Sequence, residues 1–448
     1  MTLVEEAQAE LDALGVKNRA FMARYPGERP VRQPVHTVYG GAHLYKAETT
    51  RRLGELALES LDAYGRDALE FASGVGFTSD PALAATVYER VRDKLRREAV
   101  EDFRIDFEDG FGARSDSEED QTAQSAAREV ARGMELGSLP PFLGIRVKSF
   151  GEEWKARATR TLELFLDTLL AESGGRLPDN FVVTLPKISV PEQASTLVRL
   201  FELLEKRHGL RAGSLRVELM IELTQALLGP DGRSPLAAFL DACEGRCTGA
   251  HLGTYDYTAS CGITAAYQTM AHPMCDLAKG MMLLAYAGTG IFLSDGATNV
   301  MPVGPHRAAS TPAQRADNRA VVHGAWQLAH RHIRHSLEGG FYQGWDLHPA
   351  QLPVRYAACY AFFLEGFAPM AERLRNFIEK AAQATLVGDV FDDAATGQGL
   401  LNYFLRALNC GAISLEDIAQ TGLTREEFAL RSFAKILAAR RDRLQTSG

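Results

Sequence analysis

Short strand-like runs alternate with helical stretches from residue 35 to residue 353, and this repeat constrains the fold more than any other feature. Successive runs are mostly about 35 to 40 residues apart, the length of one strand–helix unit. Eight such runs can be identified, beginning at Val35, Phe103, Phe142, Phe181, Val217, Gly249, Ile291 and Gly344. Eight units predict a parallel (β/α)8 barrel, or TIM barrel. A doubly wound open sheet is the alternative, but Gly40-Gly41-Ala42-His43 after the first strand lacks GxGxxG spacing.

The segments outside the repeat lack this alternation. Residues 1–34 are typical of a helix followed by an arm rich in proline and arginine, and residues 354–448 are typical of helices throughout. We therefore expect three parts: an N-terminal helix and arm (1–34), a barrel catalytic domain (35–353) and a C-terminal all-helical extension (354–448). Within the barrel, residues 65–80 are expected to form a loop before a helix at 81–99.

Composition excludes several classes of function. The 448 residues are 46% hydrophobic and carry a formal net charge of −8 with scattered basic residues, so a nucleic-acid partner is not expected. No apolar run reaches the roughly 18 residues of a membrane span, and the acidic start is not a secretory signal. The six cysteines form no CxxC pair, which favours reduced thiols in a cytoplasmic protein.

Two acids stand where neighbouring strand-like runs give way to turn-forming residues. Glu222 ends the run that begins at Val217, and Asp256 ends the run that begins at Gly249. Adjacent parallel strands would present both carboxylates at one edge, where they repel each other unless a cation lies between them. A hard divalent cation, Mg²⁺ with Mn²⁺ as a second possibility, is the simplest candidate. The alternative is that Glu222 caps a helix or forms a salt bridge.

Other polar residues follow the remaining strand-like runs. Arg146 ends the third run, and its planar guanidinium suits a substrate carboxylate or a developing alkoxide; the alternative is pairing with a neighbouring acid. Glu108 and Asp109 follow the second run and would act through waters, order Arg146, or solvate a loop. Lys187 follows the fourth run and would bind an acid or phosphate, or pack against the strand that carries Glu222.

Several short motifs, taken in order, resemble those of the citrate lyase β-subunit and malate synthase superfamily of aldolase-like barrels. They are Phe107-Glu108-Asp109, Arg146-Val147, Leu185-Pro186-Lys187, Ile221-Glu222, Gly253-Thr254-Tyr255-Asp256-Tyr257 and His348-Pro349. The resemblance covers roughly residues 36–400. It implies a Mg²⁺-dependent barrel that makes or breaks a carbon–carbon bond next to a carbonyl, with Gly253, Thr254 and Tyr255 among the substrate-binding residues.

The resemblance also extends to Gly388-Asp-Val-Phe-Asp392-Asp393, which is similar to the malate synthase segment that carries a catalytic aspartate. Carried over by position, Asp393 is the base, with Asp392 as the fallback; the alternative is an N-cap of the following helix. The resemblance further implies a homo-oligomer assembled through the helical tail.

The function expected from these observations is a Mg²⁺-dependent carbon–carbon lyase or aldolase of the citrate lyase β-like group. It would cleave a small hydroxy or oxo carboxylic acid, or its acyl-CoA thioester, through a metal-stabilised enolate. One alternative is a malate synthase-type condensation of an acyl-CoA with a 2-oxo acid. An alternative of another class is a non-catalytic barrel that binds a metal or an acid, because a barrel alone does not fix a function.

Overall fold

The computed structural model describes residues 2–386 and 394–446, and its centre is a closed barrel of parallel strands. Each strand pairs with the next along the chain, and β1 closes the barrel by pairing with β8, where Val38 lies opposite Asp346. The predicted (β/α)8 barrel is confirmed. The strands are β1 (His36–Gly41), β2 (Asp102–Asp106), β3 (Phe142–Arg146), β4 (Phe181–Leu185), β5 (Val217–Ile221), β6 (Cys247–Leu252), β7 (Phe292–Ala297) and β8 (Gln343–Asp346).

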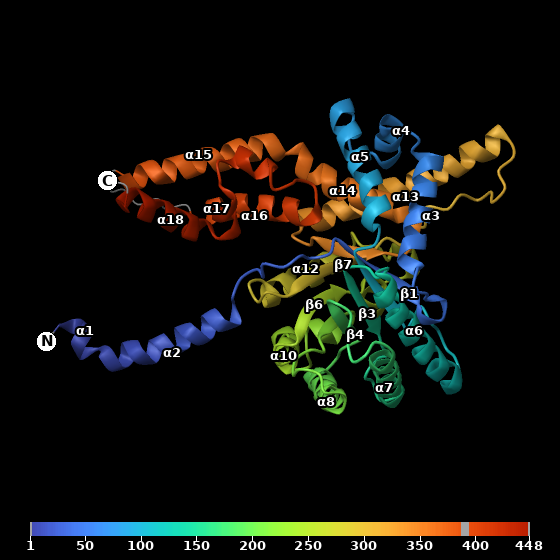
Figure 1. Cartoon of the computed structure of the whole chain (residues 1–448), viewed down its shortest axis with the longest axis horizontal. Coiled ribbons are helices and arrows are strands. Elements are labelled where there is room, and N and C mark those ends of the chain that lie inside the picture. Colours follow the sequence, from blue (N-terminus) through green and yellow to red (C-terminus); the bar gives the residue numbers. More distant parts are fainter. Residues whose placement is uncertain (1, 387–393, 447–448) are drawn as a thin grey trace.

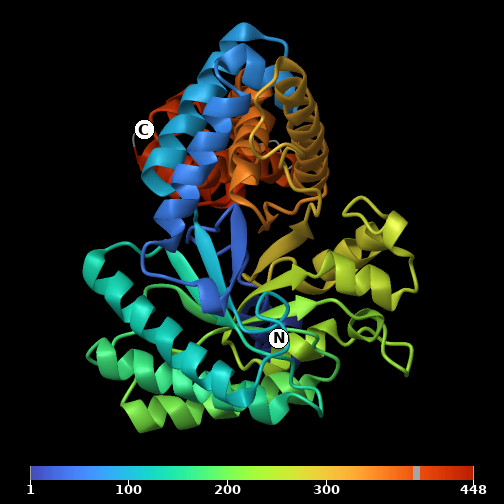
Figure 2. The same cartoon turned by 90° about the vertical axis from the view of Figure 1, so that its right-hand side faces the viewer.

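Two groups of helices surround the strands (Figures 1 and 2). One group connects β2 to β7: α6 (Asp116–Leu136), α7 (Lys155–Glu172), α8 (Pro191–His208), α9 (Thr224–Leu227), α10 (Leu236–Ala242), α11 (Thr254–Ser260) and α12 (Pro273–Tyr286). In Figure 1, α7, α8 and α10 lie below the strands, and α12 lies beside β7. The other group packs together above the strands: α3 (Thr49–Tyr64), α4 (Ala68–Val75), α5 (Pro81–Glu98), α13 (Pro312–Glu338) and α14 (Leu352–Glu365).

Both ends of the chain are helical in the described ranges. At the N-terminal end, α1 (Leu3–Glu6) and α2 (Gln8–Arg24) extend away from the barrel in Figure 1, and their residues are exposed or half-buried. After α14 the chain continues into a layer of helices beside the barrel, which contains α15 (Phe367–Leu386), α16 (Ala394–Cys410), α17 (Arg425–Ala429) and α18 (Phe433–Thr446). None of the described helices is both long enough and apolar enough to cross a membrane.

Side chains alternate between the two faces of each strand, and the alternation in β2 shows why the barrel interior is polar. Phe103 and Ile105 are buried apolar residues in the main hydrophobic core. Between them, Arg104 donates hydrogen bonds to Thr184 of β4 and Glu218 of β5, so these side chains share the barrel interior. Gly144 of β3 lies opposite Arg104, and a Cβ atom there would overlap the carbonyl oxygen of Val182.

Two local expectations were wrong. Residues 65–80 were expected to form a loop, but α4 forms within them, because Asp67 caps its first turn and Phe71 and Val75 bury one face. Asp256 was expected at the end of a strand, but β6 ends at Leu252, and Asp256 lies in the first turn of α11.

Candidate active site

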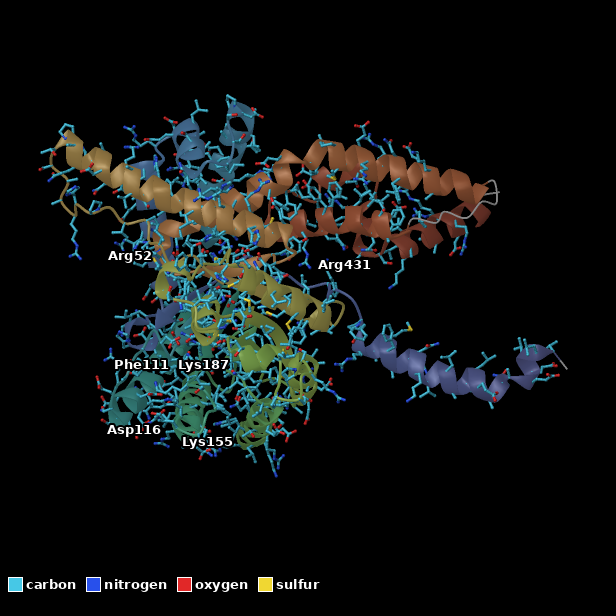
Figure 3. All side chains as sticks on the ribbon, turned by 180° about the vertical axis from the view of Figure 1, so that it is seen from behind. Arg52, Phe111, Asp116, Lys155, Lys187 and Arg431 are labelled. Carbon is cyan, nitrogen blue, oxygen red and sulfur yellow. The ribbon has the colours of Figure 1, made fainter. Side chains whose placement is uncertain are left out.

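The polar residues predicted to act together lie just beyond the carboxyl ends of neighbouring strands. Arg146 is the last residue of β3, and Glu222 follows β5 directly. Glu108 and Asp109 follow β2, Lys187 follows β4, and Asp256 lies in the first turn of α11, just after β6. In a parallel barrel these positions meet at one face. Figure 3 labels Lys187 on the barrel, together with Phe111 from the turn after β2.

Arg146 is held mainly by an acid that the sequence interpretation did not select. Its Nε donates to Oδ1 of Asp106 at 2.7 Å, and its Nη2 donates to Oδ2 at 2.5 Å. The remaining nitrogen, Nη1, lies 3.0 Å from Oε2 of Glu108 and 3.5 Å from Oδ2 of Asp109. The guanidinium also lies 4.9 Å from the ring centroid of Tyr39. Asp106 therefore fixes the orientation of Arg146, and Nη1 faces the acids of the site.

Lys187 lies at the centre of the acidic groups. Its ammonium donates to Oε1 of Glu108 at 2.5 Å and lies 3.6 Å from Oδ1 of Asp109 and 3.5 Å from Oδ2 of Asp256. Its backbone N–H donates to Oε1 of Glu222 at 2.6 Å. The backbone adopts φ of 51°, a left-handed conformation that costs a non-glycine residue about 1–2 kcal/mol. This conformation brings the amide and the ammonium of one residue to four different acids.

Glu222 is the most deeply buried of these acids, with 1% of its surface exposed. Burial raises the pKa of its carboxyl well above the ordinary value, and the charges of Glu108 and Asp256 add to the rise against the opposing charge of Lys187. Gly253 makes this position possible, because a Cβ atom at residue 253 would lie 2.6 Å from Cβ of Glu222 and would overlap its Oε2. The site therefore contains a crowded, desolvated carboxyl group.

Burial and neighbouring charges also shift the pKa values of Lys187 and Glu108. Burial lowers the pKa of Lys187, but the charges of Glu222 and Glu108 outweigh it and leave a net rise, so the ammonium stays charged. Burial raises the pKa of Glu108, and the nearby charge of Asp109 adds to the rise, while Arg146 and Lys187 oppose it. More carboxyl groups than cationic groups meet here, so a bound cation would favour the ionised forms of Glu222 and Glu108 and oppose the rise in their pKa values.

The residues present fit a hard divalent cation. The acidic groups supply carboxylate oxygens, the donors that suit Mg²⁺ or Mn²⁺, and Oε2 of Glu108 accepts no hydrogen bond although it lies 3.0 Å from Nη1 of Arg146. Glu222 and Asp256 remain the candidate ligands, and both contact Lys187. Within residues 2–386 and 394–446, no group of three or more His, Cys, Asp and Glu side chains is arranged to hold a metal ion. Water or substrate would therefore have to complete the coordination.

Of the other expected site residues, Tyr255 and Thr254 lie against β7, and Asp393 is outside the described residues. Tyr255 uses its hydroxyl to bind the end of β7 and the residues that follow it: the hydroxyl donates to the Ala297 carbonyl at 2.8 Å and accepts from the backbone N–H of Asn299 at 3.0 Å. Thr254 is buried beside Gly296, where a Cβ atom would overlap its hydroxyl. Asp393 and the fallback Asp392 lie outside the described residues, so the proposed base has no structural description.

Asp106 is the main residue that sequence reasoning missed. The signal was present, because Asp106 and Arg104 alternate with apolar Phe103, Ile105 and Phe107, which places polar groups on the inner face of β2. The partner of Asp106 could not be assigned from sequence, because Arg146 comes from a different strand and three acids follow one another at positions 106, 108 and 109.

Comparisons with known proteins agree with the fold. A family model described as "Domain of unknown function (DUF6986)" matches residues 14–436. No curated protein sequence is significantly similar to this chain. A citrate lyase structure from Burkholderia xenovorans LB400 is similar, with a TM-score of 0.51 and 18% identity over 88% of this chain and 98% of that chain. The predicted resemblance to citrate lyase is thus confirmed for the fold.

Structures of Haloferax volcanii malate synthase are also similar in part. The magnesium and glyoxylate complex has a TM-score of 0.45 and 15% identity over 74% of this chain and 76% of that chain. The lead(II) complex has a TM-score of 0.46 and 14% identity over 74% of each chain. Scores at this level do not establish a shared fold.

Proposed function

We propose that this chain, which belongs to the family described as a domain of unknown function (DUF6986), is a Mg²⁺-dependent carbon–carbon lyase or aldolase of the citrate lyase β-like group. Its substrate would be a small hydroxy or oxo carboxylic acid or its acyl-CoA thioester. One observation carries the proposal: beyond the carboxyl ends of the barrel strands, Lys187 contacts Glu222, Asp256 and Glu108, and Glu108 in turn contacts Arg146. Chemistry in barrel enzymes takes place at this face.

The roles follow from the charges of the groups. Glu222 and Asp256 would hold the metal ion, which supplies a Lewis acid that polarises a substrate carbonyl. Arg146, fixed by Asp106, would offer Nη1 to a substrate carboxylate or to the alkoxide that develops during cleavage. Lys187 would exchange its contacts with Glu108, Asp109 and Asp256 for a second anionic group of the substrate. Asp393 stays the proposed base that moves the proton at the carbon next to the carbonyl.

Three assays with a chelated and a metal-loaded enzyme test the proposal. Oxaloacetate, citramalyl-CoA, and glyoxylate with acetyl-CoA would each be offered with EDTA, Mg²⁺ or Mn²⁺. Cleavage of either of the first two that needs the metal supports a lyase. Condensation of glyoxylate with acetyl-CoA instead identifies the malate synthase-type reaction. Full activity after exhaustive chelation contradicts the role of the metal.

The non-catalytic alternative predicts a different result with one variant. If the barrel only binds an acid, Glu222→Gln should leave ligand binding unchanged, and no substrate should turn over in the wild type. If the barrel is an enzyme, Glu222→Gln should abolish the metal-dependent turnover of the wild type while the fold persists, as checked by circular dichroism.

A further inference from the structure

A cavity of about 450 Å³ lies at the end of the barrel opposite the candidate active site. Its wall contains the first residues of five strands, Asp102, Phe142, Phe181, Phe292 and Gln343. Because all strands are parallel, these residues mark the amino-terminal end of the barrel, whereas Lys187 and Glu222 follow the carboxyl ends. The volume is within the range of small-molecule sites.

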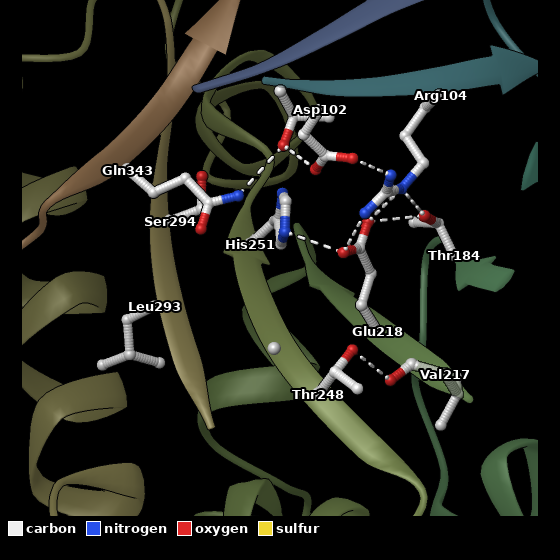
Figure 4. Close-up of polar contacts among 12 residues, drawn as sticks. Asp102, Arg104, Thr184, Val217, Glu218, Thr248, His251, Leu293, Ser294 and Gln343 are labelled. Atoms are coloured by element: carbon white, nitrogen blue, oxygen red, sulfur yellow. Dashed lines mark hydrogen bonds and ion pairs between the residues drawn. The ribbon is translucent and has the colours of Figure 1, made fainter. Parts of the chain in front are cut away.

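The inner wall of the cavity is a polar network in which the charges are already paired (Figure 4). Arg104 donates to both oxygens of Glu218 at 2.8 and 2.7 Å and forms an ion pair with Asp102. Nε2 of His251 lies 3.1 Å from Oε2 of Glu218. This wall is therefore a fixed surface, and Arg104 is not a free cation for a ligand.

Two further arginines line the same cavity and lack a carboxylate partner in the described structure. Arg29 donates from Nε to the Gly290 carbonyl at 2.6 Å and from Nη2 to the Thr248 carbonyl at 3.3 Å, and both acceptors are neutral. Arg216, just before β5, is half-buried, and within the described ranges its side chain makes no hydrogen bond or ion pair. Burial lowers the pKa of Arg29, and the positive charge of Arg216 lowers it further, so the two guanidinium groups repel each other.

Arg32, the remaining arginine of the wall, does have carboxylate partners, because it forms ion pairs with Glu98 and Glu101. The chain that carries Arg29 and Arg32 is also held in place. The backbone N–H of Gln33 donates to Oδ1 of Asn409 at 2.9 Å, and the backbone N–H of Val35 donates to Oε2 of Glu101 at 2.8 Å. The cavity is thus built by an anchored segment, and its two arginines without a carboxylate partner lie beside the half-buried rings of Phe142 and Phe292, the second of which is 5.4 Å from the Arg29 guanidinium.

We propose that this cavity is a second ligand site, which binds an organic anion with a carboxylate or phosphate group and an apolar or aromatic body. The anionic group would lie between Arg29 and Arg216, since guanidinium groups bind both kinds of anion with two parallel hydrogen bonds. The body would lie against the phenylalanines. This site is separate from the catalytic machinery, so the proposal does not depend on the proposed reaction.

Calorimetric titration of the full-length protein with three probes tests the ligand class. Phenyl phosphate and phenylacetate carry both an anion and an aromatic body, whereas benzyl alcohol carries the body alone. We expect one or both anions to bind with one site per chain and benzyl alcohol to bind at least about tenfold more weakly. Preference for one anion identifies the head group. Equal binding of benzyl alcohol and the anions, or no binding of any probe, overturns the proposal.

Matched variants locate the bound probe. Arg216→Ala should weaken anion binding at least about tenfold, Arg216→Lys should retain part of it, and Arg211→Ala, an exposed arginine five residues earlier, should bind like the wild type. Lys187→Gln, at the other end of the barrel, should also bind like the wild type. Loss of binding in Lys187→Gln with retention in Arg216→Ala would place the anion at the opposite face and overturn the proposal. Unchanged unfolding transitions exclude misfolding as the cause.

Discussion

The backbone N–H of Lys187 donates a 2.6 Å hydrogen bond to Oε1 of Glu222, which joins the turn after β4 to the residue after β5. The same lysine extends its ammonium to Asp256. The two acids predicted to share a metal ion are therefore both in contact with one residue, although they lie in different local structures. This arrangement makes the position of Glu222 the most sensitive feature of the candidate site.

Gly253→Ala should disrupt that position. The added methyl group would overlap Oε2 of Glu222 and lie 2.6 Å from its Cβ, so the carboxylate must move. We expect Mn²⁺ binding, followed by electron paramagnetic resonance, to weaken at least about tenfold. Gly280→Ala in α12 is the control, because its Cβ meets no atom within 4 Å. Equal Mn²⁺ affinity in the two variants would show that Glu222 is not a ligand.

Glu222→Gln tests the charge of the same group without changing its shape. A neutral amide is a poorer ligand for a hard cation than a carboxylate, so Mn²⁺ affinity should fall at least about tenfold and turnover should be lost. The buried pocket would also lose an acid whose pKa is raised by burial and by its acidic neighbours. Stability should therefore stay the same or rise, as measured by urea unfolding. A variant with wild-type metal affinity would leave the proposed site without support.

Asp106→Ala should destabilise the protein because it leaves Arg146 buried without its bidentate partner. Both side chains are nearly inaccessible, with exposed fractions of 2% for Asp106 and 6% for Arg146. Breaking a buried pair of this kind costs about 3 kcal/mol in the free energy of unfolding. Asp109→Ala, which removes an acid that is 59% exposed, should cost less than about 0.5 kcal/mol. Urea unfolding of both variants checks this, and equal losses would contradict the role of Asp106.

Asp346 should make the barrel sensitive to acid. Burial favours its neutral form, but the charge of Arg355 and the hydrogen bond with His36 outweigh burial and lower the pKa to about 2, from 3.8. Because the folded-state pKa is lowered, this stabilisation is complete above about pH 4 and is lost as the pH falls towards 2. The shift corresponds to about 2 kcal/mol.

Asp346→Asn should remove this pH dependence. The difference in unfolding free energy between the wild type and the variant should therefore shrink by about 2 kcal/mol between pH 5 and pH 2. Chemical denaturation at a series of pH values measures it. Parallel curves over that range would show that Asp346 does not carry the effect.

Much of the fold was predictable because it depends on the local pattern of apolar and polar residues. Short apolar runs mark β2 to β5, and the regular spacing of helices between them leaves a parallel barrel as the simplest arrangement. Parallel topology also brings Arg146, Lys187 and Glu222 to one face, whatever the details of packing. The sequence by itself therefore determined the architecture and which residues gather at the carboxyl ends of the strands.

Only the tertiary structure decided which of these groups contact each other. Asp106, Glu108 and Asp109 are near-equivalent candidates in the sequence, yet only Asp106 has the distance and direction for a bidentate contact with Arg146. Arg29 comes close to Arg216 only because the N-terminal arm crosses the far end of the barrel. The physical reason is that hydrogen bonds and ion pairs depend on ångström distances between distant segments, whereas the periodic burial of apolar side chains depends on neighbours along the chain.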